Sequence, residues 1–199
     1  MDIHTRLTEY AVMGWVYRSQ ASGVSLCWTK KHEYVIVKIT TSQDTFENEA
    51  RFLRKLSRGG KHFVVQLLEE IQAPELNVYC LVFPFLDPYD KWRTLPVKNQ
   101  NDVKSCFLQL LQVKTHLFFK TQLNLTPKGL CFIHNAGILH SDIKQSNLLL
   151  TQLNPPHPVF ADFGHSKWLA TLDDLIVGTY RYMAPELLYC LVYDVDYDP

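Results

Sequence analysis

Three short runs rich in β-branched and other apolar residues dominate the first half of the chain. They cover residues 34–39, 64–68 and 78–83. Such side chains pack well on extended backbone, so each run predicts a strand. Pro74 lies between the second and third runs, and Lys38 is a charged residue inside the first. The first part of the chain is therefore predicted to be mainly β.

One helix is predicted between the first two strands. Its inward face consists of four residues at helical spacing, Phe46, Glu49, Leu53 and Leu56. Asp44 is the expected N-cap, because Glu47 follows it three residues later as in a capping box. The pair Gly59-Gly60 is expected to end the helix. Glu49 is thus a carboxylate on an otherwise apolar stripe.

The second half of the chain has a helical pattern instead. Apolar residues recur at helical spacing over residues 106–111 and again over residues 130–134. The segment 113–128, which contains Pro127, interrupts the two stretches. Without it, residues 107–112 would continue directly into 129–134 as one helical pattern. Residues 113–128 are therefore predicted to be an insertion.

Two origins of this insertion remain open. It begins with Val113, whose codons all start with GT, and ends with Lys128, one of whose codons ends in AG. It therefore has the form of a short in-frame intron kept in the gene sequence, which sequencing of the spliced transcript would test. The alternative is a genuine surface insertion, which costs a fold little stability.

The composition indicates a globular chain without a nucleic-acid or membrane partner. The 199 residues are 47% hydrophobic, and 20 Lys and Arg balance 20 Asp and Glu without a basic stripe. The five cysteines are widely spaced and the eight histidines form no metal motif, so reduced thiols are expected and a protein-only metal site is not. The start lacks an apolar signal core and no run has the length of a membrane helix. An intracellular location, in cytoplasm or nucleus, is expected.

Three ordered motifs carry the chemistry of the chain. Residues 140–147 have the spacing H-x-D-x-K-x-x-N, residues 162–164 read D-F-G, and residues 184–186 read A-P-E. In this order they resemble the signatures of the protein kinase superfamily. Lys144, two residues after Asp142, resembles the serine/threonine type. Residues 178–188 and 148–150 resemble cyclin-dependent-kinase relatives. The glycine-poor segment before Lys38 and residues 83–85 also resemble fungal kinases that activate cyclin-dependent kinases.

This resemblance implies an α+β, bilobal protein-kinase-like fold that binds ATP between its lobes. Residues 1–86 would form a β-rich N-terminal lobe with one helix. Residues 87–199 would form a partial, helical C-terminal lobe with the catalytic loop and the activation segment. The family continues into a helix that anchors the C-terminal lobe, so the chain is expected to be truncated after the activation segment and to have poor stability.

The resemblance also assigns roles to five residues of the second lobe. Asp142 would accept the proton of the substrate hydroxyl, and Lys144 would reach the transferred phosphate. Asn147 and Asp162 would hold Mg²⁺ through hard oxygen atoms. Thr179 would lie in the substrate-docking end of the activation segment and hydrogen-bond near Asp142.

The first lobe would bind the nucleotide. Lys38 would hold the α- and β-phosphates, and Glu49 is the first candidate for its ion-pair partner, with Glu47 as the rival. Phe83 would precede a hinge in which Pro84 offers its carbonyl and Leu86 its N–H to adenine. In isolation, Lys38 would be read first as a strand-edge lysine and Glu49 as an ordinary solvated helix carboxylate. The downstream motifs favour the nucleotide-binding roles instead.

Three departures from the family pattern bear on activity. Counting back from Lys38 puts residues 18–23 where the glycine-rich phosphate loop lies, and only Gly23 remains of its glycines. Ile36 replaces a small residue above adenine. Ser141 replaces the arginine that binds a phosphorylated activation loop, so regulation by that route is not expected.

Two functions follow as hypotheses. The first is an ATP- and Mg²⁺-dependent serine/threonine protein kinase that acts on a protein substrate, with a cyclin-dependent kinase or cyclin-like protein as a further partner in the cell cycle. The alternative is a truncated or pseudokinase-like protein that binds nucleotide or a partner without phosphotransfer. The poor glycine content favours the alternative, whereas the intact Lys38, Asp142, Asn147 and Asp162 favour the enzyme.

Overall fold

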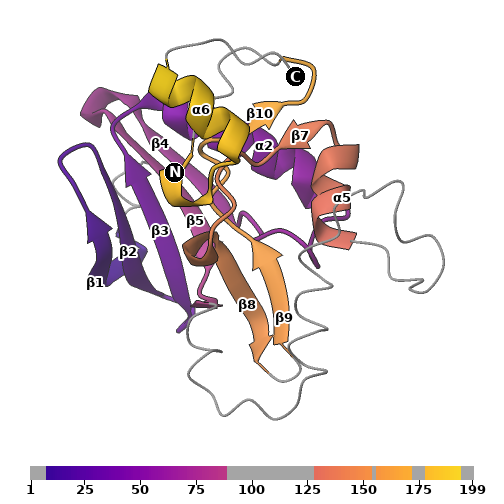
Figure 1. Cartoon of the computed structure of the whole chain (residues 1–199). Coiled ribbons are helices and arrows are strands. Elements are labelled where there is room, and N and C mark those ends of the chain that lie inside the picture. The colour runs from indigo at the N-terminus through magenta and orange to yellow at the C-terminus, as the bar shows by residue number, and fades with distance from the viewer. Residues whose placement is uncertain (1–7, 89–127, 154–155, 172–177, 194–199) are drawn as a thin grey trace. The chain divides into compact units, whose positions relative to one another are not determined.

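The computed structural model of the chain describes residues 8–88, 128–153, 156–171 and 178–193 (Figure 1). Two compact units can be distinguished, one made of Met1–Lys61 with Val65–Leu86 and the other of His62–Val64 with Asp87–Pro199. The helical pattern at 106–111 lies outside the described residues, as does the predicted insertion except for its last residue, Lys128.

The first unit contains a five-stranded antiparallel sheet with the strand order β1-β2-β3-β5-β4 (Figure 1). Its strands are β1 (Tyr10–Arg18), β2 (Ser22–Thr29), β3 (Tyr34–Thr40), β4 (Glu69–Ala73) and β5 (Val78–Pro84). The predicted strands at 34–39 and 78–83 are confirmed as β3 and β5. β5 lies between β3 and β4 and is buried on both faces, which explains its nearly continuous apolar sequence.

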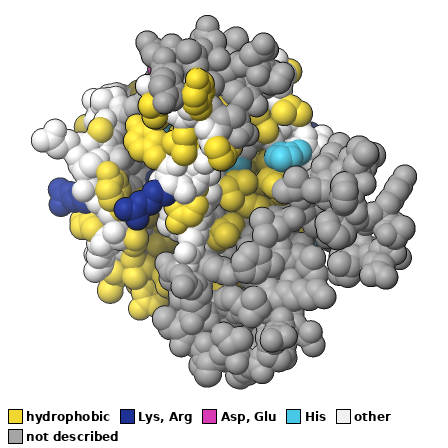
Figure 2. All heavy atoms as spheres, viewed as in Figure 1, with side chains coloured by type: hydrophobic (Ala, Val, Ile, Leu, Met, Phe, Trp, Pro, Cys, Tyr) yellow, Lys and Arg dark blue, Asp and Glu magenta, His cyan; other side chains and the backbone are white. Residues whose placement is uncertain are grey.

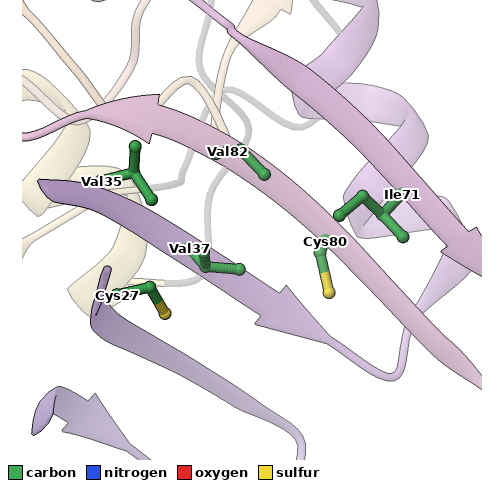
Figure 3. Close-up of a cluster of buried hydrophobic side chains, with 6 residues drawn as sticks. All are labelled: Cys27, Val35, Val37, Ile71, Cys80 and Val82. Carbon is green, nitrogen blue, oxygen red and sulfur yellow. The ribbon is translucent and has the colours of Figure 1, made fainter. Parts of the chain in front are cut away.

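One face of the sheet carries the hydrophobic core of this unit. Six buried residues form it, Cys27, Val35, Val37, Ile71, Cys80 and Val82 (Figure 3). Tyr10 packs against this cluster, and its hydroxyl donates a hydrogen bond to the Glu69 carboxylate. Tyr10 lies in one edge strand, β1, and Glu69 in the other, β4. The sheet therefore curls around its core far enough for one side-chain hydrogen bond to link its two edge strands.

Helix α2 (Gln43–Ser57) covers part of the opposite face. Its buried positions include Phe46, Glu49, Leu53 and Leu56, which confirms the predicted stripe. The Phe46 ring contacts that of Tyr79 at a centroid distance of 5.6 Å. At the other end of this face the rings of Trp28, Tyr34 and Phe85 are in contact, and Figure 2 shows hydrophobic side chains on the surface over β2 and β3.

Two local predictions in this unit are wrong. Ser42, not Asp44, is the N-cap of α2, because the Ser42 hydroxyl accepts the N–H of Thr45 at 3.2 Å. Residues 64–68 do not form a regular strand, since Val64 makes only an isolated bridge to Phe160. The strand forms at β4 instead, whose sequence Glu-Glu-Ile-Gln-Ala is too polar to predict from hydrophobic pattern. An edge strand can expose one side to water, so it needs few apolar residues.

The described part of the second unit combines two helices with short strands. The helices are α5 (Lys128–Asn135) and α6 (Pro185–Tyr193), and α5 confirms the helical pattern at 130–134. The strands are β6 (Asp87–Pro88), β7 (Ile138–Leu139), β8 (Leu148–Leu153), β9 (Pro156–Phe160) and β10 (Lys167–Trp168). They pair as β6-β8-β9 and β7-β10, and the loop between β7 and β8 carries residues 140–147. The pairing of β8 with β9 holds this loop next to residues 161–164, which directly follow β9.

His140 lies in the core of the second unit and is only 1% exposed. Its ring contacts those of Phe160 and Phe163, at 6.0 Å and 4.7 Å between centroids. Its Nδ1 accepts the Asp142 N–H at 3.3 Å, so Nε2 carries the proton and donates to the Ala161 carbonyl at 3.0 Å. Burial lowers the pKa of His140, against weaker opposing contributions from the Ala161 hydrogen bond and nearby carboxylates. The imidazole is therefore neutral at pH 7.

No helix in the described residues is both long and apolar enough to cross a membrane. Cys27 and Cys80 are buried free thiols, and Cys131 is a partly buried one. Burial raises the pKa of Cys80 to about 11, so this thiol is protonated and chemically inert at pH 7.

The Tyr10 to Glu69 hydrogen bond is predicted to stabilise the curled sheet. Tyr10→Phe removes the donor and leaves a partly buried carboxylate with one partner fewer, so the free energy of unfolding should fall by about 1.5 kcal/mol. Urea unfolding measures this change. Tyr17→Phe is the control, because Tyr17 lies in the same strand with an exposed side chain, and its effect should stay within about 0.5 kcal/mol. Equal effects of the two substitutions would contradict the prediction.

The buried neutral His140 predicts a loss of stability in weak acid. Its pKa is lower in the folded than in the unfolded chain, so below about pH 6.5 the unfolded state binds more protons. Stability should be complete above that pH and should fall as the pH drops, by at most about 1.4 kcal/mol per pH unit for this one group. Urea unfolding at pH 7.5 and 5.5 tests this.

His140→Gln should be less stable than the wild type at both pH values but should lose less on acidification. His165→Gln is the matched control, since His165 is exposed, and it should keep the wild-type pH dependence. An unchanged pH dependence in His140→Gln would show that another group causes the acid sensitivity.

Candidate active site

The carboxylate of Asp142 is the centre of a polar network in the second unit. Its side chain is 2% exposed, and Lys144 Nζ lies 2.7 Å from Oδ2. The backbone N–H and the hydroxyl of Thr179 both donate to Oδ1, at 3.0 Å and 2.7 Å. Asn147 Nδ2 donates to Oδ2 at 3.1 Å and to the Asp142 carbonyl at 2.9 Å. Each carboxylate oxygen is thus satisfied by donors from the loop 140–147 or from Thr179.

This network keeps Asp142 ionised. Burial by itself raises the pKa of the carboxyl, but the hydrogen bonds from Lys144 and Thr179, the charge of Lys144 and the Asn147 amide together outweigh burial. The pKa of Asp142 therefore lies below its ordinary value. A carboxylate that is buried, ionised and oriented by fixed donors is equipped to orient a hydroxyl group and accept its proton.

Lys144 and Thr179 are linked to each other as well as to Asp142. Lys144 Nζ donates to the Thr179 hydroxyl at 2.9 Å, and this hydroxyl donates onward to Asp142. The predicted hydrogen bond between Thr179 and the neighbourhood of Asp142 is confirmed. The structure thus brings Asp142, Lys144, Asn147 and Thr179 together, although Thr179 follows Asp142 by 37 residues.

Asn147 and Asp162 present oxygen atoms suited to a hard cation. The Asn147 amide nitrogen is committed to Asp142, whereas its oxygen accepts only a long hydrogen bond from the Ser146 hydroxyl, at 3.5 Å, and has a second lone pair for another ligand. Asp162 has a left-handed backbone with φ of 64°, which is uncommon for a non-glycine residue and occurs often at functional sites. Among the described residues no group of three or more His, Cys, Asp or Glu side chains could hold a metal ion. The oxygen atoms of Asn147 and Asp162 fit Mg²⁺, because this ion takes few protein ligands and completes its shell with phosphate and water.

The first unit contains a second charged pair on the face covered by α2. Lys38 Nζ of β3 lies 2.7 Å from Glu49 Oε2 of α2, and the Glu49 side chain is only 2% exposed. Glu47, the rival, is exposed and accepts a hydrogen bond from Gln43 at 2.7 Å. The ion pair predicted for Lys38 is therefore made with Glu49. A buried carboxylate needs a cation nearby, and Lys38 provides it while a quarter of its own side chain stays exposed.

A further ion pair, which the sequence analysis missed, also joins α2 to the sheet. Arg54 Nε donates to Glu70 Oε1 at 2.6 Å, and its Nη2 contacts Oε2 of the same carboxylate. Glu70 lies in β4, the strand that the hydrophobic pattern did not predict. No spacing rule relates Arg54 to Glu70, because their proximity depends on the packing of the helix against the sheet.

The β1–β2 hairpin occupies the position of the predicted phosphate loop, and its tip is closed by its own hydrogen bonds. Ser19 N–H donates to the Ser22 carbonyl at 2.8 Å, and Ser22 N–H donates to the Ser19 hydroxyl at 3.1 Å. The Ala21 carbonyl accepts the Thr41 N–H at 3.0 Å. Two amides that could face a phosphate are therefore already used within the turn.

Gly23 lies in β2 next to this turn and is buried. A Cβ at this position would come within 2.6 Å of the Trp15 ring. The absence of a side chain at Gly23 is thus explained by packing against Trp15. Pro84 ends β5, and Leu86 follows it two residues later as a partly buried residue at the end of the first unit.

Comparisons with known proteins agree with the motifs. The protein kinase domain model matches residues 13–199. The chain is 28% identical over 198 residues to a probable CTD kinase subunit alpha homolog of Encephalitozoon cuniculi, covering 93% of this chain and 53% of that protein. It is 29% identical over 146 residues to the human serine/threonine-protein kinase ULK3, covering 72% of this chain and 28% of that protein.

A third relative is cyclin-dependent kinase 20 of Danio rerio, 28% identical over 142 residues, with 69% of this chain and 41% of that protein covered. The chain thus spans about half or less of the length of these relatives. Together with the α+β architecture and the three ordered motifs, the family match identifies the chain. It belongs to the protein kinase domain family and resembles serine/threonine kinases related to cyclin-dependent kinases.

Proposed function

We propose that this protein is a serine/threonine protein kinase that transfers the γ-phosphate of ATP to a protein hydroxyl. The Asp142 network carries the proposal, because it combines an ionised buried carboxylate with a lysine, an amide and a hydroxyl within hydrogen-bonding distance. Phosphoryl transfer requires positioned groups and charge neutralisation rather than covalent chemistry by the protein. These four residues can supply both.

Each residue of the network has a distinct task in this proposal. Asp142 orients the acceptor hydroxyl and takes its proton as the phosphorus–oxygen bond forms. Lys144 places a positive charge beside the transferred phosphate, and Thr179 holds both Asp142 and Lys144 in position. Asn147 and Asp162 would hold Mg²⁺, which neutralises phosphate charge when it is bound.

In the first unit, Lys38 would bind the α- and β-phosphates and Glu49 would orient it. The Pro84 carbonyl and the Leu86 N–H would bind adenine. Leu26 and Ile36 are directly opposite each other on β2 and β3 and share a face of the sheet with Lys38, so they would contact the adenosine. Gly23 would contribute through its backbone, next to the serine-closed turn.

Protein substrates and a cyclin-like partner belong to this proposal. Two relatives are named as a CTD kinase subunit and a cyclin-dependent kinase, and these names support a partner of the cyclin type and a role in the cell cycle. A cytoplasmic or nuclear location follows from the same proposal. Binding to the partner would be detected by co-purification of the two proteins.

One observation favours a second candidate function, a nucleotide- or partner-binding protein without phosphotransfer. The hairpin tip uses the amides of Ser19 and Ser22 internally, so it offers fewer N–H groups to a phosphate than a glycine-rich loop does. ATP binding without turnover would support this candidate. The radiolabelling experiment below distinguishes the two.

Phosphate transfer is predicted to depend on the charge of Asp142. With radiolabelled ATP, Mg²⁺ and a serine/threonine peptide library as acceptor, Asp142→Asn should lower kcat by about 100-fold or more. The replacement keeps the size of the side chain but removes the proton acceptor. Phosphoamino-acid analysis of the product should give phosphoserine and phosphothreonine.

Asp44→Asn is the matched control, because Asp44 is an exposed carboxylate in the first turn of α2, and its kcat should equal that of the wild type. Asp162→Ala should also abolish transfer, since it removes an expected Mg²⁺ ligand. Equal labelling by the wild type and Asp162→Ala would reject phosphotransfer and leave the second candidate.

The two glutamates of α2, Glu47 and Glu49, are predicted to differ in their effect on ATP use. Glu49→Gln weakens the ion pair that orients Lys38, so kcat/KM for ATP should fall about tenfold or more. Glu47→Gln changes an exposed carboxylate two residues earlier on the same helix and should leave kcat/KM within about twofold. Steady-state kinetics at varied ATP concentration provide the comparison, and the reverse order of effects would contradict the assignment of Glu49.

A further inference from the structure

Gly178 makes an unusually close approach to the loop that carries Asp142. Its φ is 116°, a conformation that L side chains rarely adopt. A Cβ added to Gly178 would lie 2.3 Å from the Ser141 carbonyl oxygen and 3.7 Å from Asp142 Oδ1. Real contacts between a carbon and a carbonyl oxygen are about 3.3 Å or longer, so a side chain at 178 would displace backbone by about 1 Å.

The close approach is separable from the left-handed backbone itself. Gly137 also has a positive φ, of 74°, but a Cβ at that position would meet no atom within 4 Å. Both glycines belong to the second unit. Gly137 therefore shares a positive φ with Gly178, at a value closer to the left-handed α region, without the contact of Gly178.

The contact adjoins the hydrogen bonds that orient the candidate base. Ser141 directly precedes Asp142, and Gly178 directly precedes Thr179. The Thr179 N–H and hydroxyl lie 3.0 Å and 2.7 Å from Asp142 Oδ1. A displacement of about 1 Å at Gly178 or Ser141 would carry these pairs beyond hydrogen-bond distance.

The Ser141 carbonyl has little freedom to move away. Ser141 itself has a left-handed backbone with φ of 64°. The residue before it, His140, is held through both ring nitrogens and through its carbonyl, which accepts the Ser166 hydroxyl at 3.3 Å. The residue after it is Asp142, which is held by Lys144, Asn147 and Thr179. A collision at 178 would therefore displace the residues that surround the Asp142 carboxylate.

We propose that Gly178 is a positioning residue for phosphoryl transfer. Because Gly178 has no Cβ, its Cα can lie close to the Ser141 carbonyl, and this contact sets the distance between Thr179 and Asp142. This inference rests on the proposed kinase function for its effect on rate. Its geometric part, the link between residue 178 and the Thr179–Asp142 hydrogen bonds, can be measured in an inactive protein as well.

The test compares Gly178→Ala with Gly137→Ala in three measurements. The first is kcat with radiolabelled ATP and a serine/threonine peptide library. The second is the Kd of the fluorescent nucleotide TNP-ATP with Mg²⁺, and the third is the hydrogen-exchange rate of the Thr179 amide by NMR. Gly178→Ala should lower kcat by about 100-fold, with TNP-ATP affinity unchanged within about twofold and faster Thr179 exchange. Gly137→Ala should match the wild type in kcat and in Thr179 exchange.

Several outcomes would overturn the proposal. Wild-type kcat and Thr179 exchange in Gly178→Ala would remove it, and so would an equal loss in Gly137→Ala, which would assign the effect to backbone strain alone. A wild-type protein that transfers no phosphate would reject the kinase function. In that case the exchange rate of Thr179 still decides whether Gly178 sets the hydrogen bonds.

A second variant covers the case in which Gly178→Ala does not fold. Adding Ser141→Gly frees the backbone at 141 to turn its carbonyl away from the new methyl group. Cooperative unfolding should return in Gly178→Ala/Ser141→Gly, but kcat and Thr179 exchange should stay impaired, because Asp142 moves with residue 141. Recovery of wild-type kcat in the double variant would overturn the positioning role.

Discussion

The buried carboxylate of Asp142 is the constraint around which the described part of the second unit is arranged. An ionised group removed from water is costly unless charged and hydrogen-bonding partners replace its hydration. Lys144, Asn147 and Thr179 together supply four contacts to its two oxygens. Because these partners come from both the loop 140–147 and the segment that begins at Gly178, satisfying one carboxylate fixes two stretches of chain that are distant in sequence.

The same constraint acts in the first unit on Glu49. Its side chain lies on the buried face of α2, where a charge is costly without a partner, and Lys38 on the facing strand provides a cation at 2.7 Å. Arg54 and Glu70 add a second, more exposed pair between α2 and the sheet. The orientation of α2 thus depends on charge as well as on the apolar contacts of Phe46 and Leu53.

Hydrophobic pattern predicted α2 and α5 because each buries a face whose residues recur at helical spacing, and it predicted β3 and β5 because both are short runs rich in β-branched and other apolar residues. It failed for β4, where an edge strand needs only Ile71 and Ala73 inward, and for residues 64–68, which are apolar without being a strand. It also selected Asp44 over Ser42 as the N-cap. Caps and edge strands depend on one or two hydrogen bonds, and several residues nearby are chemically able to make them.

The order and spacing of the motifs in the sequence determined the family and identified the polar residues of the candidate site. They did so because metal binding, proton transfer and charge neutralisation demand particular side chains, and those are visible without coordinates. Sequence favoured Glu49 without excluding Glu47, and it could not pair Arg54 with Glu70 or reveal that Gly178 meets the Ser141 carbonyl. Tertiary structure decided these three contacts. Each depends on which faces and loops meet across long stretches of chain, and local periodicity carries no information about such meetings.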